Sequence, residues 1–125
     1  MKLLSMNLKS TETAKIALKT YFNIMKEWDV NEGKQRILLG KPDEFTFERW
    51  KRGSVTTLTS DVLERISYVL GIYKNLGILF PERAQANEWL NKPNEAFNGS
   101  TALNRMLLGT IGNLREVRYY LDEQL

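Results

Sequence analysis

Residues 31–53 read NEGKQRILLGKPDEFTFERWKRG, and this stretch decides the fold. Its first part has apolar residues at helical spacing and ends at Gly40, a residue that commonly terminates helices. Pro42 and Asp43 then suit the first turn of a second helix, which ends at Gly53. Two short helices joined by a tight connection are typical of a helix-turn-helix.

In a helix-turn-helix the second helix enters the major groove of DNA, and side chains near its N-terminus meet base edges. Phe45 and Trp50, with Ile37 and Leu38, are predicted to hold the two helices together. A helical hairpin that binds no nucleic acid remains an alternative. The candidates for base contacts are Thr46, Phe47 and Arg49, and those for phosphate contacts are Lys41, Lys51 and Arg52.

The rest of the chain also shows apolar residues at helical spacing and no sustained strand-like alternation. We therefore predict an all-α fold, in which an N-terminal helix-turn-helix bundle is followed by a small helical domain. Further helices are expected over about residues 11–28, 61–77, 84–90, 101–108 and 114–122. The predicted division is a flexible N-terminus over 1–11, a DNA-binding and dimerisation region over 12–80, and a C-terminal domain over 81–125.

The composition excludes much of the usual catalytic chemistry. The 125 residues contain no histidine and no cysteine, so a Ser-His-Asp triad, a thiol nucleophile and thiolate metal sites are impossible. The carboxylates are scattered like those of a solvated surface. We predict that the protein is no enzyme and holds no metal or cofactor. No apolar run is long enough for a bilayer and MKLLSMNLKS is no convincing signal peptide, so a cytoplasmic protein without membrane contact is expected.

The positive charge is concentrated in the first two-thirds of the chain. The net charge is +3, with 13 Lys and Arg against 9 Asp and Glu through Phe80, and 5 against 6 from Pro81 onward. A basic excess around the helix-turn-helix suits a partner with a phosphate backbone, although a solvated basic face would give the same count.

A second informative stretch, residues 88–109, reads EWLNKPNEAFNGSTALNRMLLG. Asn94 and Asn98 can bond the backbone of a turn through their side-chain amides, and Gly99 can adopt a positive φ. Thr101 can cap the next helix. With Phe97 as an anchor between two helices, the stretch predicts a stapled interhelical loop.

The C-terminal sequence EWLNKPNEAFNGSTALNRMLLGTIGNLREVRYYLDEQL resembles the toxin-binding domain of the Xre/MbcA/ParS antitoxins. Upstream, DVLERISYVLGIYKNLGILF also resembles this family, and LLGKPDEFTFERWKRG is similar to its Xre-type helix-turn-helix. Members often have proline where this chain has Ala102, but alanine forms helices well and the helix is expected to persist. The matching C-terminal residues are Trp89, Leu90, Pro93, Asn94, Phe97, Gly99, Leu103, Gly109, Val117 and Leu121.

The resemblance implies an antitoxin with two binding surfaces. Its C-terminal domain would block a toxin encoded beside it, commonly a RES-domain protein that consumes NAD, and its N-terminal domain would repress its own operon by binding operator DNA. The residues expected to meet the toxin are Trp89, Asn94, Phe97, Asn98 and Arg105.

Helix-turn-helix proteins usually read palindromic operators as dimers, so we also expect a homodimer. Its interface would use the apolar faces near 16–28 or 62–73. Two other readings stay open: a stand-alone helix-turn-helix regulator without a toxin, whose C-terminal domain binds a small ligand or dimerises, and an adaptor that binds only protein.

Overall fold

A computed structural model describes the backbone of residues 2–125 and the side chains from residue 10 onward. Over these residues the chain forms helices joined by turns, which confirms the all-α prediction. The elements are α1 (Lys2–Glu27), α2 (Glu32–Leu38), α3 (Glu44–Lys51), α4 (Ser60–Leu79), α5 (Arg83–Trp89), the 3-10 turn η1 (Glu95–Phe97), α6 (Ala102–Met106) and α7 (Ile111–Gln124).

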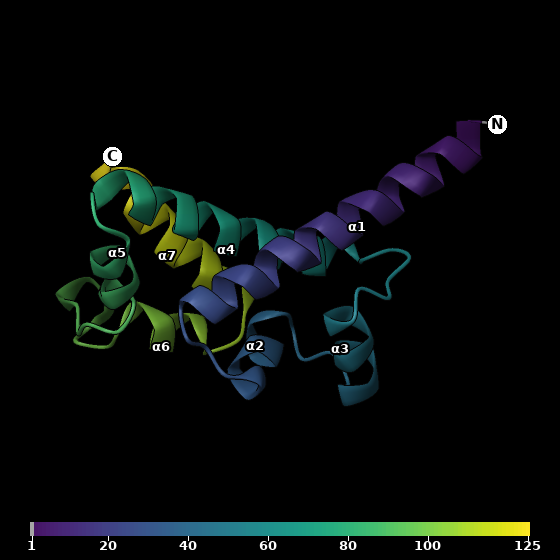
Figure 1. Ribbon diagram of the computed structural model, residues 1–125. Helices are drawn as coiled ribbons and strands as arrows, with labels where there is room; N and C mark the ends of the chain where they lie inside the picture. The colour runs from purple at the N-terminus through teal and green to yellow at the C-terminus, as the bar shows by residue number, and fades with distance from the viewer. Residues whose placement is uncertain (1) are drawn as a thin grey trace.

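The long helix α4 lies at the centre of the molecule. It packs against α1, α5 and α7, and polar contacts join it to α7 from Glu64 to Asn75. Figure 1 shows α2 and α3 below α1, and α5, α6 and α7 gathered at the other end of the molecule. The chain thus has a helix-turn-helix part and a C-terminal part, and both pack against α4.

One hydrophobic core runs through both parts. Each of the three long helices buries a stripe of apolar side chains with the spacing of a single helical face. The boundary predicted between residues 80 and 81 coincides with the end of α4, yet the core continues across it. Central members of the core are Leu18, Tyr21 and Met25 of α1, Ile66, Val69, Ile72 and Leu76 of α4, and Leu114, Val117 and Leu121 of α7.

The first helix begins earlier than the sequence predicted. A start near Thr11 was expected, whereas the backbone of α1 begins at Lys2. The prediction that residues 1–11 are flexible lies mostly outside the described residues, because the side chains of residues 1–9 are not described.

The start of α4 is capped by a threonine. Asp61 and Glu64 have the spacing of a capping pair, but the cap is Thr59, whose hydroxyl accepts a hydrogen bond from the Val62 amide at 3.2 Å. Asp61 instead lies inside the helix and accepts a bond from Arg65. A threonine two residues earlier satisfies one free amide of the first turn, so the aspartate is available for another partner.

Tyr21 links α1 to the helix-turn-helix and gives a pH-dependent prediction. It is fully buried, its hydroxyl donates to the Gln35 carbonyl at 2.7 Å, and burial raises its pKa well above 10, opposed in part by the charge of Arg65. Its contribution to the free energy of unfolding is therefore complete below pH 10 and is lost as pH rises beyond it, because the unfolded chain ionises first. Tyr21→Phe should lower stability at pH 7 by about 1 kcal/mol and flatten this alkaline decline. Urea unfolding of both proteins from pH 7 to 11 measures the difference; parallel curves would contradict it.

Candidate functional site

The connection between α2 and α3 closes tightly because two consecutive residues are left-handed. Gly40 has φ +92° and Lys41 φ +62°. The Gly40 amide donates to the Ile37 carbonyl at 3.1 Å, and the Lys41 amide donates to the Arg36 carbonyl at 2.8 Å. This pair of bonds satisfies the last carbonyls of α2, and a glycine at the first position avoids strain. Arg36 adds two bonds to the Pro42 carbonyl, at 2.9 and 3.2 Å, which fix the approach to α3.

Asp43 starts α3. Its carboxylate accepts a hydrogen bond from the Thr46 amide at 2.7 Å, and this bond lowers the pKa of Asp43. The helix ends with Gly53 at φ +81°. The predicted helix-turn-helix is therefore present, with both helix starts capped by a side chain, since Asn31 does the same for α2.

The two phenylalanines of α3 have the opposite roles from those predicted. Phe47 was expected to reach bases, but it is 1% exposed and packs edge-on against Phe22 of α1, with ring centroids 5.8 Å apart. Phe45 was expected to hold the helices together, but it is 71% exposed. The structure therefore removes Phe47 from the candidate base contacts and offers Phe45 in its place.

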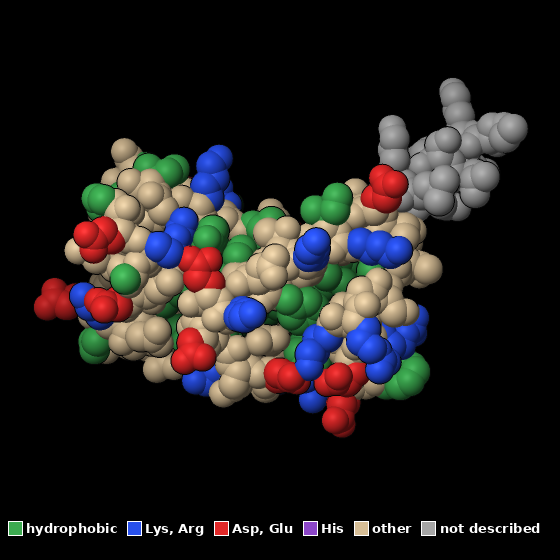
Figure 2. Space-filling model, viewed as in Figure 1, with side chains coloured by type: hydrophobic (Ala, Val, Ile, Leu, Met, Phe, Trp, Pro, Cys, Tyr) green, Lys and Arg blue, Asp and Glu red, His purple; other side chains and the backbone are tan. Residues whose placement is uncertain are grey.

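The outward face of α3 carries Phe45, Arg49 and Arg52, whose spacing of four and three residues places them on one side of the helix. The Arg49 guanidinium lies 5.8 Å from the centre of the Phe45 ring. Thr46 and Trp50 flank this face and are half-buried. Figure 2 shows Lys and Arg side chains crowded around α3 and along α1.

Not all the predicted phosphate-binding residues are equally available. Lys51 lies 2.5 Å from Glu32 and 3.6 Å from Glu48, and its hydrogen bond to Glu32 raises its pKa. Lys41 and Arg52 are exposed, and no carboxylate of the described side chains pairs with either. A cation without a carboxylate partner binds a phosphate more strongly than one that must first break an ion pair.

The loop between α5 and α6 is built around Asn94. Its backbone amide donates to the Ser100 carbonyl, its carbonyl accepts from the Gly99 amide, both at 3.0 Å, and its side chain accepts from the Ala96 amide at 2.9 Å. The predicted turn role of Asn94 is thus confirmed. Thr101 caps α6 through the Asn104 amide at 3.0 Å, also as predicted.

The rings of Trp89, Phe97 and Tyr120 form an aromatic cluster that joins this loop to α5 and α7. Phe97 is 1% exposed and meets Trp89 and Tyr120 edge-on, at centroid distances of 6.3 and 5.3 Å. Trp89 and Tyr120 stack nearly parallel, 6.1 Å apart. Phe97 was predicted both to anchor the loop and to contact a partner; its ring anchors the loop on α5 and α7 and has almost no surface left for a partner.

The remaining predicted partner contacts differ in exposure. Asn98 is exposed and left-handed, with φ +56°, so its amide is presented to solvent. Arg105 is half-buried, 3.6 Å from Glu116 and 5.9 Å from the centre of the Phe97 ring. Sequence reasoning missed Leu108, which is 64% exposed at the end of α6. A leucine next to Gly109 gives no sequence signal of exposure, because the same pattern also ends buried helices.

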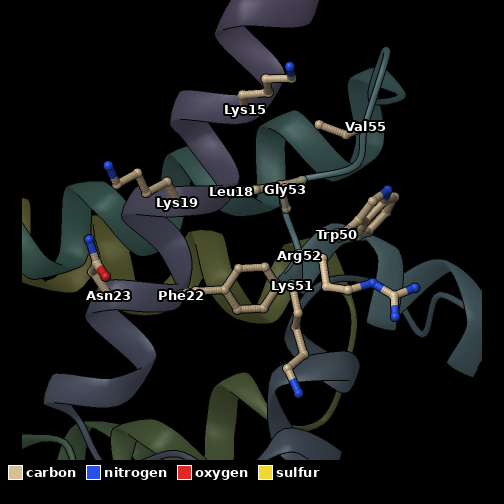
Figure 3. A pocket seen from close by; sticks show the side chains of 10 residues that line it. All are labelled: Lys15, Leu18, Lys19, Phe22, Asn23, Trp50, Lys51, Arg52, Gly53 and Val55. Carbon is tan, nitrogen blue, oxygen red and sulfur yellow. The ribbon is translucent and has the colours of Figure 1, made fainter.

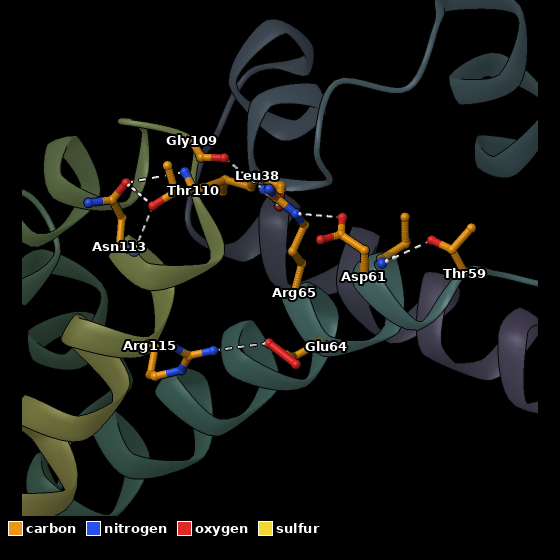
Figure 4. A network of polar contacts seen from close by, with 10 residues as sticks. Leu38, Thr59, Asp61, Glu64, Arg65, Gly109, Thr110, Asn113 and Arg115 are labelled. Carbon is orange, nitrogen blue, oxygen red and sulfur yellow. Dashed lines mark hydrogen bonds and ion pairs between the residues drawn. The ribbon is translucent and has the colours of Figure 1, made fainter.

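Arg65 connects the two candidate surfaces (Figure 4). Its side chain is buried and donates to the Gly109 carbonyl at 3.0 Å, to the Leu38 carbonyl at 3.5 Å and to Asp61 at 3.0 Å. These acceptors lie in the segment before α7, at the end of α2, and on α4. One guanidinium therefore fixes the helix-turn-helix and the C-terminal part to the central helix.

Two features of the described residues bear on other kinds of function. No helix among them combines the length and hydropathy of a bilayer span. No group of three or more acidic side chains placed to hold a metal ion occurs among them either.

Comparison with known proteins gives two matches that together cover most of the chain. Residues 8–71 match the antitoxin Xre-like helix-turn-helix domain, and residues 75–124 match the antitoxin Xre/MbcA/ParS C-terminal toxin-binding domain. The first match ends and the second begins inside α4, with three residues between them. An uncharacterized protein of Sinorhizobium fredii, y4oB, is 38% identical over 117 residues, which cover 92% of this chain and 90% of that protein. No solved structure is significantly similar.

Proposed function

Because the chain belongs to the Xre/MbcA/ParS antitoxins, with a DNA-binding helix-turn-helix and a toxin-binding domain, we propose that it neutralises a RES-type, NAD-degrading toxin and represses its own operon. The C-terminal domain would cover the active site of the toxin, and the N-terminal domain would bind operator DNA. Both tasks are binding tasks, which suits a chain without imidazole or thiol groups. The proposal places the protein in the cytoplasm, where operon and toxin meet.

The observation that carries the DNA-binding part is the outward face of α3. Phe45, Arg49 and Arg52 lie on a helix that is fixed at both ends, by the Asp43 cap and by Gly53. Arginine is the side chain best suited to bidentate contact with guanine, and an exposed ring can contact a thymine methyl group. Lys41 and Arg52 are the free cations for phosphate, whereas Lys51 must first leave Glu32.

Arg49→Ala should therefore weaken operator binding by about 1–3 kcal/mol, the worth of one good base contact. Lys51→Ala should have a smaller effect, since its ammonium is already held by two carboxylates. Fluorescence anisotropy with the promoter duplex measures both, and a toxicity assay with the neighbouring toxin gene measures neutralisation. Neutralisation should persist in both variants; an equal loss of both activities would refute two separate surfaces.

For the toxin, the proposal rests on the surface around the aromatic cluster. Asn98 lies on the loop, whose backbone is held by Asn94 and Phe97, and the partly exposed Trp89 lies at the end of α5 beside it, so the surface offers a polar and an apolar contact. A preordered loop loses little conformational entropy on binding, so it suits a tight inhibitor. Covering a nucleotide pocket requires shape and hydrogen bonds, and no reactive group.

A homodimer is proposed as the DNA-binding form. Ile16 on α1 is 66% exposed, while the apolar residues of α4 are largely occupied by α1 and α7. The N-terminal part of α1 also extends beyond the other helices (Figure 1). These observations favour α1 over α4 as the contact, and light scattering of the purified protein gives the stoichiometry.

The alternative is a stand-alone regulator without a toxin. The exposed Asn98 does not favour it, because a domain used only for dimerisation needs no ordered polar loop. Co-purification with the product of the neighbouring gene separates the two: a stable complex supports the antitoxin, and its absence supports the regulator.

A further inference from the structure

An open cleft of about 350 Å³ lies between α1 and α3, outside the outward face of α3. Its floor is apolar and is formed by Leu18 and Phe22 of α1, by Trp50, and by Val55 after α3. Its rim is basic, with Lys15 and Lys19 on one side and Lys51 and Arg52 on the other (Figure 3).

Three of the four rim cations are free to bind an anion. Among the described side chains, no carboxylate lies within 4.0 Å of the charged groups of Lys15, Lys19 or Arg52, whereas Lys51 is held by Glu32 and Glu48. Lys15 and Lys19 are one helical turn apart and both exposed. Glu12, one turn before Lys15, is the acidic residue of α1 nearest to them in sequence. The rim therefore has an excess of uncompensated positive charge.

We propose that this cleft binds the sugar-phosphate backbone of the same duplex whose major groove receives α3. Lys15, Lys19 and Arg52 would contact phosphates, and the apolar floor would pack against a sugar. The inference rests on the proposed DNA binding and adds a contact surface on α1 that lies outside the helix-turn-helix itself. Arg52 borders both the cleft and the outward face, so the two surfaces are continuous.

The shape of the cleft favours a polymer over a small anion. In Figure 3 the charged ends of Lys15, Lys19, Lys51 and Arg52 point apart around the rim and do not converge on one point. All four residues are exposed, and the buried lining residues, Leu18 and Val55, are apolar, so no buried donor faces the interior. Diverging cations suit successive phosphates along a strand, while a mononucleotide needs converging donors.

The test compares the full-length protein with Lys15→Ala/Lys19→Ala on two duplexes, the promoter and a scrambled sequence of equal length. Each phosphate contact contributes about 0.9 to the slope of log K against log salt concentration, so the double variant should lose about 2 from that slope. Because phosphates carry no sequence, its affinity should fall by a similar factor for both duplexes. Both effects are measured by anisotropy titrations at KCl concentrations from about 50 to 300 mM, a range over which phosphate contacts change the affinity strongly.

The matched control is Lys74→Ala/Lys92→Ala, which removes the same charge from exposed positions on α4 and after α5. It should retain the slope of the wild type, and thermal melts confirm that both double variants fold. If the Lys15/Lys19 variant keeps the wild-type slope while the wild type binds the promoter, the cleft inference is overturned and the proposed function stands. If the wild type binds neither duplex, both fail.

A further arm examines a small ligand. ATP is titrated into the wild type and the double variant while tryptophan fluorescence is followed, since Trp50 lines the cleft. No saturable change is expected. A saturable change that the double variant lacks, together with an unchanged salt slope, would show that the cleft binds a nucleotide and would overturn the proposal.

Discussion

Phe97→Ala is expected to lower the free energy of unfolding by about 3–5 kcal/mol and to abolish toxin binding. The ring is 1% exposed and contacts Trp89 and Tyr120, so its removal leaves a cavity between α5, the loop and α7. The loop is otherwise held by a few backbone bonds around Asn94. Without its anchor it would no longer present one conformation to the toxin. Urea unfolding and a pull-down with the toxin measure the two effects.

Two further variants separate loop geometry from direct contact. Phe97→Leu keeps an apolar anchor and should retain much of the stability and binding. Asn98→Gly removes an exposed amide at a left-handed position where glycine causes no strain, so stability should change by no more than about 0.5 kcal/mol. Weaker toxin binding by this variant would place Asn98 in the contact. Wild-type binding by a folded Phe97→Ala protein would show that the toxin does not read this loop.

The helix-turn-helix was predictable because its signals are local. Gly40, Asp43 and Gly53 act on their own neighbours in sequence, through a left-handed turn, a cap and a helix end. The same reasoning located the Asn94 turn and the Thr101 cap. Where a residue satisfies backbone groups within four positions of itself, the sequence contains the whole interaction.

The orientation of the two phenylalanines in α3 was not predictable in the same way. Phe45 and Phe47 are two residues apart on a short helix, and polar residues flank both. What buries Phe47 is Phe22, which lies 25 positions earlier, on α1. Burial that depends on a contact with a residue distant in sequence cannot be inferred from the local spacing of apolar residues. Phe97 was predicted to anchor the loop, but its contact with Tyr120 of α7, which leaves its ring no free surface, could not be inferred from the loop sequence.

The role of α4 was likewise hidden. The spacing of its apolar residues indicated a buried helix but not that α1 and α7 would both pack against it. Residues 81–125 therefore depend on a helix that precedes them. Leu114, Val117 and Leu121 of α7 would be exposed if these residues were isolated, so the two binding surfaces belong to one folded body.

Arg65→Met is the variant expected to damage both surfaces at once. The methionine keeps most of the apolar stem but removes the donors to Gly109 and Leu38, so two carbonyls in a buried region lose their partner. Hydrogen bonds from a charged group are worth about 1.5–3 kcal/mol each, and the bond to Leu38, at 3.5 Å, is the weaker one. The free energy of unfolding should fall by about 2–3 kcal/mol, which urea denaturation measures.

The matched control for Arg65→Met is Asp61→Ala, which removes only the carboxylate partner. Asp61 is half exposed but Arg65 is buried and keeps its two carbonyl acceptors, so the loss of Asp61 should cost about 1 kcal/mol, less than the loss of Arg65. A large effect of Arg65→Met beside a small effect of Asp61→Ala would assign the stabilisation to the two carbonyls and thus to the connection between the domains. Equal effects would assign it to the ion pair within α4. Arg65 would then stabilise its own helix only, and operator and toxin binding would not weaken together.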